Sequence, residues 1–171
     1  HMDCKVKKCV FNSEDDIINE IIEAVNDAKK TIHLMHFWFS WKPIADSLIN
    51  AHSKGIQVNI LTDQRTLVKL MEDEQILYKI SVLEHMNNNG IKNIKVYFKK
   101  LLHHKVIIID DLLIIGSLNL FKRSIQDHVE NLIFIKSENA CKAYKKEFEF
   151  CYDDALELEK ALEKTKYYVR N

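Results

Sequence analysis

The chain contains, at residues 103–119, the segment HHKVIIIDDLLIIGSLN. Two short runs, 105–109 and 112–115, are apolar apart from Lys105 and are separated by the pair Asp110-Asp111, and this pattern predicts a hairpin of two buried β-strands. An imidazole, an ammonium, a hydroxyl and an amide flank the open end of this hairpin. Such a set, without metal-ligand spacing, suits attack on a phosphodiester better than other common reactions.

Helical and strand patterns alternate on both sides of the hairpin. Helices are expected to begin near Ser13, at Pro43 and near Glu138, with Gly55 ending the second, and a further helical region at 66–86. The C-terminal segment has apolar residues at helical spacing and should form one long helix. Further strands are expected at 31–39, 56–62, 94–98 and 131–135. This order predicts an α/β fold with a mixed, largely parallel β-sheet flanked by helices on both faces.

Length and composition fit one compact domain over residues 3–171. The chain has 171 residues, 47% of them hydrophobic and 29% charged, with three glycines and one proline, so no linker is evident. His1-Met2 is interpreted as a tag remnant or a start methionine. No apolar run approaches the roughly 20 residues that span a bilayer. A removed N-terminal anchor stays open as an alternative.

The four cysteines are predicted to be free, buried thiols. Cys141 and Cys151 lie about 15 Å apart if they share a helix, well beyond the reach of a disulfide. Cys4 and Cys9 are similarly separated if they share a strand. Free thiols indicate an intracellular, reducing compartment, either the cytoplasm or an organelle surface. No Cys-x-x-Cys or His-x-x-x-His pair occurs, so we expect no metal and no cofactor.

Strand alternation groups the polar residues at the hairpin's open end. His103 and Lys105 should face one side, with His104 facing the other, and Ser117 and Asn119 should share a side. If the two segments end side by side, the four polar groups converge and can stabilise charge on a phosphate. The alternative is that each is an ordinary solvated residue at a strand end.

These residues form a longer pattern that resembles a known family. The pattern is His103-x-Lys105-x-x-x-x-Asp110, then Gly116-Ser117-x-Asn119, then Glu130. It resembles the HKD signature of the phospholipase D superfamily. Segments 37–40, 55–63 and 130–133 extend the resemblance to the small branch with one motif per chain, which includes the Zucchini-type endonuclease, also called mitochondrial phospholipase D, and bacterial Nuc-like endonucleases.

The resemblance implies a catalytic role for each motif residue. His103 would attack phosphorus to form a phosphohistidine, while Lys105 and Asn119 would bind phosphate oxygens. Ser117 would support them by hydrogen bonding, and Glu130 would orient and polarise His103. A histidine held by a carboxylate is a good nucleophile and acid at neutral pH.

Asp110 is the remaining motif residue. As a turn carboxylate, it should fix backbone or lysine geometry without contacting substrate.

The chain has a single copy of the motif, yet the family's mechanism needs one histidine as nucleophile and another as general acid. We therefore expect a homodimer with the active site at the two-fold interface.

Charge around the motif favours nucleic acid as substrate. The net charge is zero, but cations flank the motif on both sides. The substrate-binding candidates are Lys99, Lys100, Lys122, Arg123 and Trp41. We expect these residues to bind single-stranded DNA or RNA, which makes a metal-independent, single-strand-preferring endonuclease the first choice.

Two other functions remain as alternatives. Trp38, Phe39 and Trp41 could form an aromatic surface at a membrane, and a phospholipase D could then hydrolyse a phospholipid such as cardiolipin or phosphatidylcholine. A non-catalytic nucleic-acid-binding scaffold could keep the same fold. The scaffold is disfavoured because a binding module does not need a histidine supported by a carboxylate.

Overall fold

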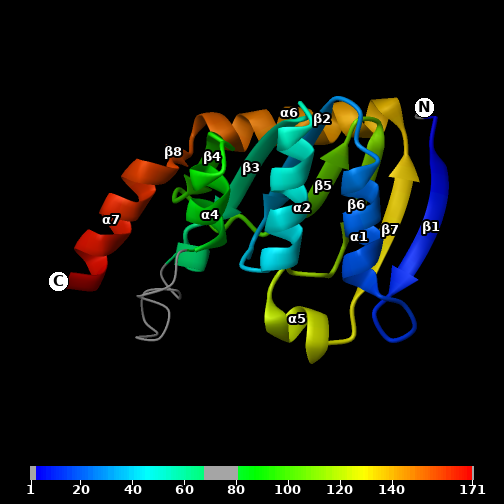
Figure 1. The fold of residues 1–171 in the computed structure, drawn as a ribbon, viewed down its shortest axis with the longest axis horizontal. Helices are drawn as coiled ribbons and strands as arrows, with labels where there is room; N and C mark the ends of the chain where they lie inside the picture. The colour runs from blue at the N-terminus through cyan, green and yellow to red at the C-terminus, as the bar shows by residue number, and fades with distance from the viewer. Residues whose placement is uncertain (1–2, 68–80, 171) are drawn as a thin grey trace.

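The computed structural model describes residues 3–67 and 81–170, in which helices and strands alternate along the chain (Figure 1). In chain order the elements are β1 (Lys5–Phe11), α1 (Ile17–Asn26), β2 (Thr31–His36), α2 (Lys42–Ser53), β3 (Gln57–Asp63), α4 (Val82–Asn88), β4 (Asn93–Tyr97), β5 (Lys105–Ile109), β6 (Leu112–Gly116), α5 (Lys122–Gln126), β7 (Asn131–Lys136), α6 (Glu138–Asp153), β8 (Leu156–Glu157) and α7 (Leu158–Arg170). The predicted hairpin is β5–β6.

The described strands form one mixed sheet in the order β1-β7-β6-β5-β2-β3-β4-β8. The predicted α/β class is confirmed, but the parallel part is smaller than expected. Within residues 3–67 and 81–170, only β2–β3 and β3–β4 are parallel pairs. The hairpin makes β6 antiparallel to β5, and β7 returns antiparallel to β6, because antiparallel neighbours need no helical crossover.

Helices cover both faces of the sheet, with α1, α2 and α4 on one side and α6 on the other (Figure 1). Strand β5 shows why both faces are covered. Ile107 and Ile109 belong to the apolar cluster that includes α1 and α2, whereas Val106 and Ile108 belong to the cluster that includes α6. Burial of each such side chain contributes roughly 1.5–3 kcal/mol, which explains the continuous apolar run in the sequence.

The boundaries of the first two helices follow local chemistry. The N-cap of helix α1 is Asp16, three residues later than the expected Ser13, and its side chain accepts a hydrogen bond from the Asn19 N–H at 3.0 Å. Pro43 lies in the first turn of α2, as predicted. Gly55 follows this helix with a φ of 91°, a conformation that glycine adopts without strain.

The C-terminal segment is not one long helix, contrary to the prediction. Helix α6 ends at Asp153, and Leu156 and Glu157 form the short strand β8 before α7 begins. Strand β8 pairs with the edge of β4, where Leu156 lies opposite Val96. This long-range pairing overrides the local helical pattern.

Two other predicted elements differ from the structure. The strand expected at 31–39 ends at His36, after which Phe39 forms only an isolated bridge with Leu120. Of the helical region expected at 66–86, residues 68–80 lie outside the described residues. Helix α4 has its own N-cap, since the Ser81 hydroxyl accepts a hydrogen bond from the Glu84 N–H at 3.2 Å.

All four cysteines are free, as predicted. Cys141 and Cys151 are buried on α6, but Cys4 and Cys9 are exposed because β1 lies at the edge of the sheet. The prediction that all four are buried is therefore wrong for the N-terminal pair.

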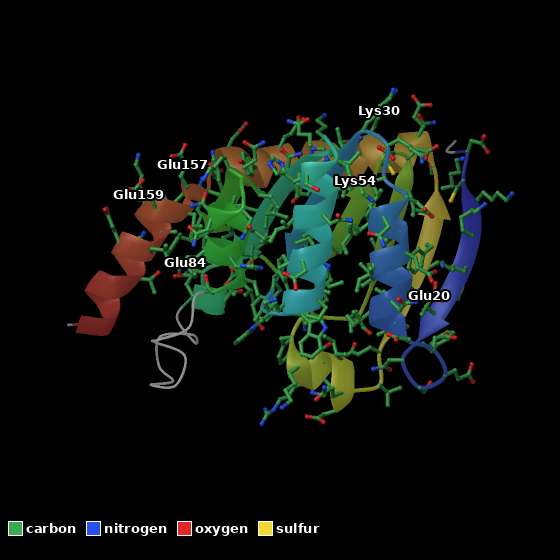
Figure 2. All side chains as sticks on the ribbon, in the orientation of Figure 1. Glu20, Lys30, Lys54, Glu84, Glu157 and Glu159 are labelled. Atoms are coloured by element: carbon green, nitrogen blue, oxygen red, sulfur yellow. The ribbon has the colours of Figure 1, made fainter. Side chains whose placement is uncertain are left out.

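Charged side chains of both signs are spread over the outer surface. Figure 2 shows Lys30, Lys54 and Glu159 projecting away from the ribbon, and all three are exposed. Among the described residues, no helix combines the length and apolar character that crossing a bilayer requires.

Candidate active site

The motif residues other than Asp110 come together at one edge of the sheet because several strands end there. In the register of the sheet, His36 at the end of β2 lies opposite Lys105 at the start of β5. Gly116 at the end of β6 lies opposite Leu132 near the start of β7. The residues just beyond these strand ends therefore meet, and helix α5 lies at the same edge (Figure 1).

His103 and Lys105 form the exposed half of the site. The Lys105 Nζ lies 3.5 Å from His103 Nε2 and donates a hydrogen bond to the His103 carbonyl oxygen at 3.2 Å. The Phe37 ring packs against the His103 imidazole with the ring centroids 5.2 Å apart. As predicted, His104 faces the other way, toward Glu147 on α6. An exposed imidazole beside an ammonium can approach a phosphate group and stabilise its charge.

Asp63 fixes the backbone just before His103, and the sequence interpretation did not identify this role. Its side chain is fully buried at the end of β3. One carboxylate oxygen accepts the Leu102 N–H at 2.8 Å, and the other accepts two hydrogen bonds from Arg65, each at 2.9 Å. The signal available in the sequence was a carboxylate at the end of a predicted strand.

Glu130 anchors the second half of the site through hydroxyl groups. The Ser117 hydroxyl donates a short hydrogen bond to one carboxylate oxygen, and the Ser124 hydroxyl donates to the other at 3.2 Å. His128 Nδ1 lies 3.3 Å from the same oxygen that Ser124 contacts. Glu130 is nearly buried, and its own N–H is bound by the Asn12 side chain at 2.8 Å. Ser124 and Asn12 were missed because their roles depend on long-range packing.

Asn119 is positioned by the same network. Its backbone N–H donates a hydrogen bond to the Ser124 hydroxyl at 2.9 Å, and that hydroxyl donates to Glu130. The Asn119 Oδ1 is buried without a hydrogen-bond partner among the described residues. Buried polar atoms are normally paired, so this oxygen is an exception among the described residues.

Gly116 is required by the close approach of two backbones. A Cβ at this position would lie 2.1 Å from the Asn131 carbonyl oxygen. This approach allows the Ser117 N–H to donate to the same oxygen at 3.0 Å and brings the Ser117 side chain to Glu130. The glycine of the motif thus positions the serine that follows it.

Electrostatics link the two halves of the site. Partial burial lowers the pKa of Lys105, while the Glu130 carboxylate acts in the opposite direction and favours the ammonium form. Burial, reinforced by the Lys105 charge, lowers the pKa of His36 to about 3. His36 is therefore a neutral neighbour of Lys105 at neutral pH. No hydrogen bond joins Glu130 to His103 in the part of the chain that the structure describes, so the orienting role of Glu130 stays a prediction.

Asp110 does not lie with the other candidate catalytic residues. It is at the far end of β5, five residues from Lys105, a span of about 17 Å in a strand. Its φ of 54° forms the hairpin turn. Its carboxylate accepts backbone N–H groups of Lys29, Lys30 and Thr31 at 2.8, 2.9 and 3.1 Å, and these hydrogen bonds lower its pKa against the opposing effect of burial. This position does not bring Asp110 to the other candidate catalytic residues, and its hydrogen bonds agree with the expected role in fixing the backbone.

The predicted substrate-binding residues surround the site unevenly. Lys99 and Lys100 line a pocket of 540 Å³ together with His103, and Lys99 also forms an ion pair with Asp154 at 3.1 Å. Lys122 and Arg123 are exposed on α5.

Trp41 is the exception among these candidates. It is half-buried against the core, and its indole nitrogen is inaccessible and lacks a hydrogen-bond partner within the described residues. Its indole ring therefore serves mainly as packing.

A family model described as "Cardiolipin synthase, PLD-like domain" matches residues 21–152. Because this match covers most of the chain and includes every motif residue, the chain belongs to the phospholipase D-like family. The predicted resemblance is confirmed.

Particular relatives show how broad this family is. Mitochondrial cardiolipin hydrolase of Xenopus tropicalis is 24% identical over 143 residues, which is 82% of this chain and 63% of that protein. Phospholipase D of Rickettsia typhi is 31% identical over 129 residues, 72% of this chain and 57% of that protein. The chain thus spans about three fifths of these curated relatives. The crystal structure of Nuc from Salmonella typhimurium, a phospholipase D family member, has a TM-score of 0.78 at 20% identity, covering 91% of this chain and 98% of that one, and so shares the fold.

Proposed function

We propose that this chain is a metal-independent phosphodiesterase in which His103 forms a phosphohistidine. The observation that carries the proposal is the exposed His103 imidazole, with the Lys105 ammonium 3.5 Å from its Nε2. Asn119 and Glu130 are held in one hydrogen-bond network at the same sheet edge. A nucleophile, a cation and an amide donor are the groups that this reaction needs.

The chemistry proceeds in two displacements. An imidazole nitrogen of His103 forms a bond to phosphorus while the bond to the leaving oxygen breaks, and that oxygen takes a proton from a second histidine. Water then attacks the phosphohistidine, gives a proton to the second histidine and releases the phosphomonoester. Lys105 and Asn119 stabilise the phosphate oxygens in both steps, so no metal ion is needed for charge stabilisation.

The second histidine is His103 of another copy of the chain in a homodimer. The single copy of the motif supports this arrangement, because one chain supplies only one motif histidine and the two displacements need two. Sedimentation should show a dimer at assay concentrations. An active protein that sediments only as a monomer would exclude the shared site.

Single-stranded nucleic acid is the favoured substrate. Lys100, Lys122 and Arg123 are exposed around the site and can contact successive phosphates. Phe121, beside Trp38 with ring centroids 5.2 Å apart, offers an aromatic surface at the start of α5. Affinity for a single strand should then fall with salt at a log–log slope of about −0.7 per phosphate contacted.

A phospholipid is the second candidate substrate. Leu101 and Phe150 are exposed and line the same pocket as His103, so they could contact acyl chains. Of the aromatic surface expected from Trp38, Phe39 and Trp41, Phe39 is fully buried and so cannot contact a membrane.

One substrate panel tests these proposals. Single-stranded DNA, single-stranded RNA, duplex DNA and cardiolipin vesicles would be incubated with the wild type, with His103→Ala and with the distant control His85→Ala, each with and without EDTA. We expect the wild type and the control to cleave a single strand in EDTA, and His103→Ala to bind it without cleavage. Hydrolysis of cardiolipin vesicles alone would favour the phospholipase D. Binding of nucleic acid without cleavage by the wild type would favour the non-catalytic scaffold.

A further inference from the structure

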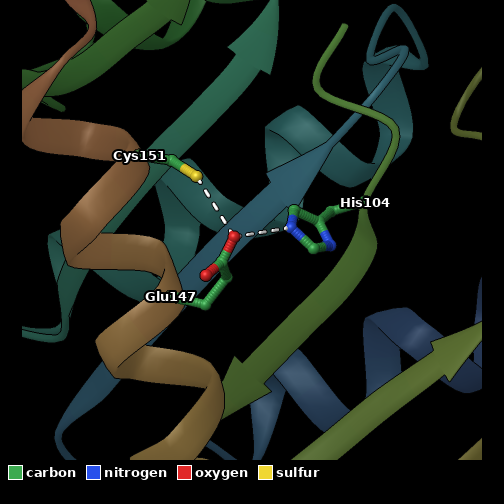
Figure 3. Close-up of side chains that lie close together, drawn as sticks. All are labelled: His104, Glu147 and Cys151. Atoms are coloured by element: carbon green, nitrogen blue, oxygen red, sulfur yellow. Dashed lines mark hydrogen bonds and ion pairs between the residues drawn. The ribbon is translucent and has the colours of Figure 1, made fainter. Parts of the chain in front are cut away.

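Three different metal-binding groups meet on the α6 side of the sheet, next to but outside the proposed site (Figure 3). His104 Nε2 lies 3.2 Å from Glu147 Oε1, and Cys151 Sγ lies 3.4 Å from the same oxygen. All three ligand atoms are within 4.8 Å of one another. Glu147 and Cys151 are one turn apart on α6, and the segment leading into β5 presents His104 to them.

We propose that His104, Glu147 and Cys151 bind one zinc ion, with a water molecule as the fourth ligand. Imidazole, carboxylate and thiolate are the three side-chain groups that zinc binds in proteins. The proposed phosphodiesterase chemistry assigns no role to any of them.

The distances agree with a tetrahedral zinc site. Zn–N and Zn–O bonds of about 2.0 Å and a Zn–S bond of about 2.3 Å place neighbouring ligand atoms about 3.3 Å apart for nitrogen and oxygen and about 3.5 Å apart for sulfur and oxygen. The observed separations to Glu147 Oε1 are 3.2 and 3.4 Å. His104 Nε2 and Cys151 Sγ lie within 4.8 Å of each other, and a bound zinc ion would hold them about 3.5 Å apart.

The surroundings provide both access and charge balance. The three residues line the 540 Å³ pocket, which gives an ion and its water a route from solvent. One carboxylate and one thiolate neutralise the two positive charges of zinc. Burial raises the pKa of the Cys151 thiol to about 11, with the Glu147 carboxylate adding to the effect. On binding, the S–H bond breaks, a Zn–S bond forms, and the proton passes to solvent.

Cobalt titration of the chelator-treated protein tests the site, because a thiolate bound to Co²⁺ produces a charge-transfer band in the near ultraviolet. We expect one Co²⁺ per chain, displaced by Zn²⁺, and no charge-transfer band for Cys151→Ser. Glu147→Gln and His104→Asn should weaken zinc binding at least about 100-fold, since even changes beyond the ligands cost roughly 10–100-fold. Cys141→Ser, which alters the other cysteine of α6, and Cys9→Ser, which alters an exposed one, are matched controls and should bind as the wild type does.

Two results would overturn the proposal. One is a cobalt band that survives in Cys151→Ser, and the other is wild-type affinity in the exposed-residue variant Glu147→Gln. Circular dichroism establishes that each variant is folded. Zinc should also raise the melting temperature of the wild type and leave that of Glu147→Gln unchanged, a readout that does not depend on phosphodiesterase activity.

Discussion

Asp63→Asn should destabilise the protein strongly although it changes one oxygen to an NH₂ group. The amide oxygen can still accept from Arg65, but the new NH₂ group faces the Leu102 N–H, a donor against a donor. Both Asp63 and Leu102 are almost completely buried, so water cannot replace the lost acceptor. The lost hydrogen bond and the unpaired N–H together lower the free energy of unfolding by about 2–4 kcal/mol.

Urea denaturation followed by circular dichroism measures this change, and hydrogen exchange locates it at the Leu102 amide. Asp46→Asn is the matched control, because the Asp46 carboxylate likewise pairs with a basic side chain, Lys42, and contacts a second group, the His85 imidazole, but is half-exposed. The control should lose less than about 1 kcal/mol. Since Leu102 precedes His103, Asp63→Asn should also lower kcat/KM about 10–100-fold. An unchanged urea midpoint together with a still-protected Leu102 amide would refute this reasoning.

Three further outcomes are expected. Gly116→Ala should lower the free energy of unfolding by about 2–3 kcal/mol in urea, because its Cβ would meet the Asn131 carbonyl oxygen; wild-type stability would contradict this. The pKa of His36 is lowered to about 3 in the folded state, so below pH 6.5 the unfolded state binds more protons than the folded state. The free energy of unfolding should therefore fall as the pH drops from 6.5 toward 3, and His36→Leu should flatten this dependence. Iodoacetamide should label exposed Cys9 faster than Cys141, whose thiol pKa burial raises to about 11; equal labelling rates by mass spectrometry would argue against the packing of α6.

The fold was predictable where local pattern and packing demand the same structure. The hairpin strands are apolar from Val106 to Ile109 and from Leu112 to Ile115 because both faces of the hairpin are covered, and its turn is marked by two aspartates. The break between α6 and α7 was not predictable, because the residues of β8 fit a helical pattern and are drawn into the sheet by β4, about 60 residues earlier in the sequence. The N-terminal strand β1 likewise depends on its pairing with distant β7.

The candidate site likewise contains residues that local sequence predicts and residues that depend on distant contacts. His103 and Lys105 are close in sequence, and strand alternation is enough to place them on one side. The supports of Glu130 are not local, since Asn12 reaches it from 118 residues away. The His104, Glu147 and Cys151 cluster is also non-local, so a search for short metal-ligand spacings could not find it.

The position of Asp110 shows that one sequence signature contains a residue that supports the fold and, at the other end of β5, the proposed catalytic residue His103. Its carboxylate joins the β5–β6 turn to the residues that begin β2, at the end of β5 remote from His103. In this chain these hydrogen bonds support the fold independently of substrate cleavage. Along a lineage that loses catalysis, selection could therefore retain the aspartate while releasing the histidine, and a chain with Asp110 but no His103 would be a folded pseudoenzyme.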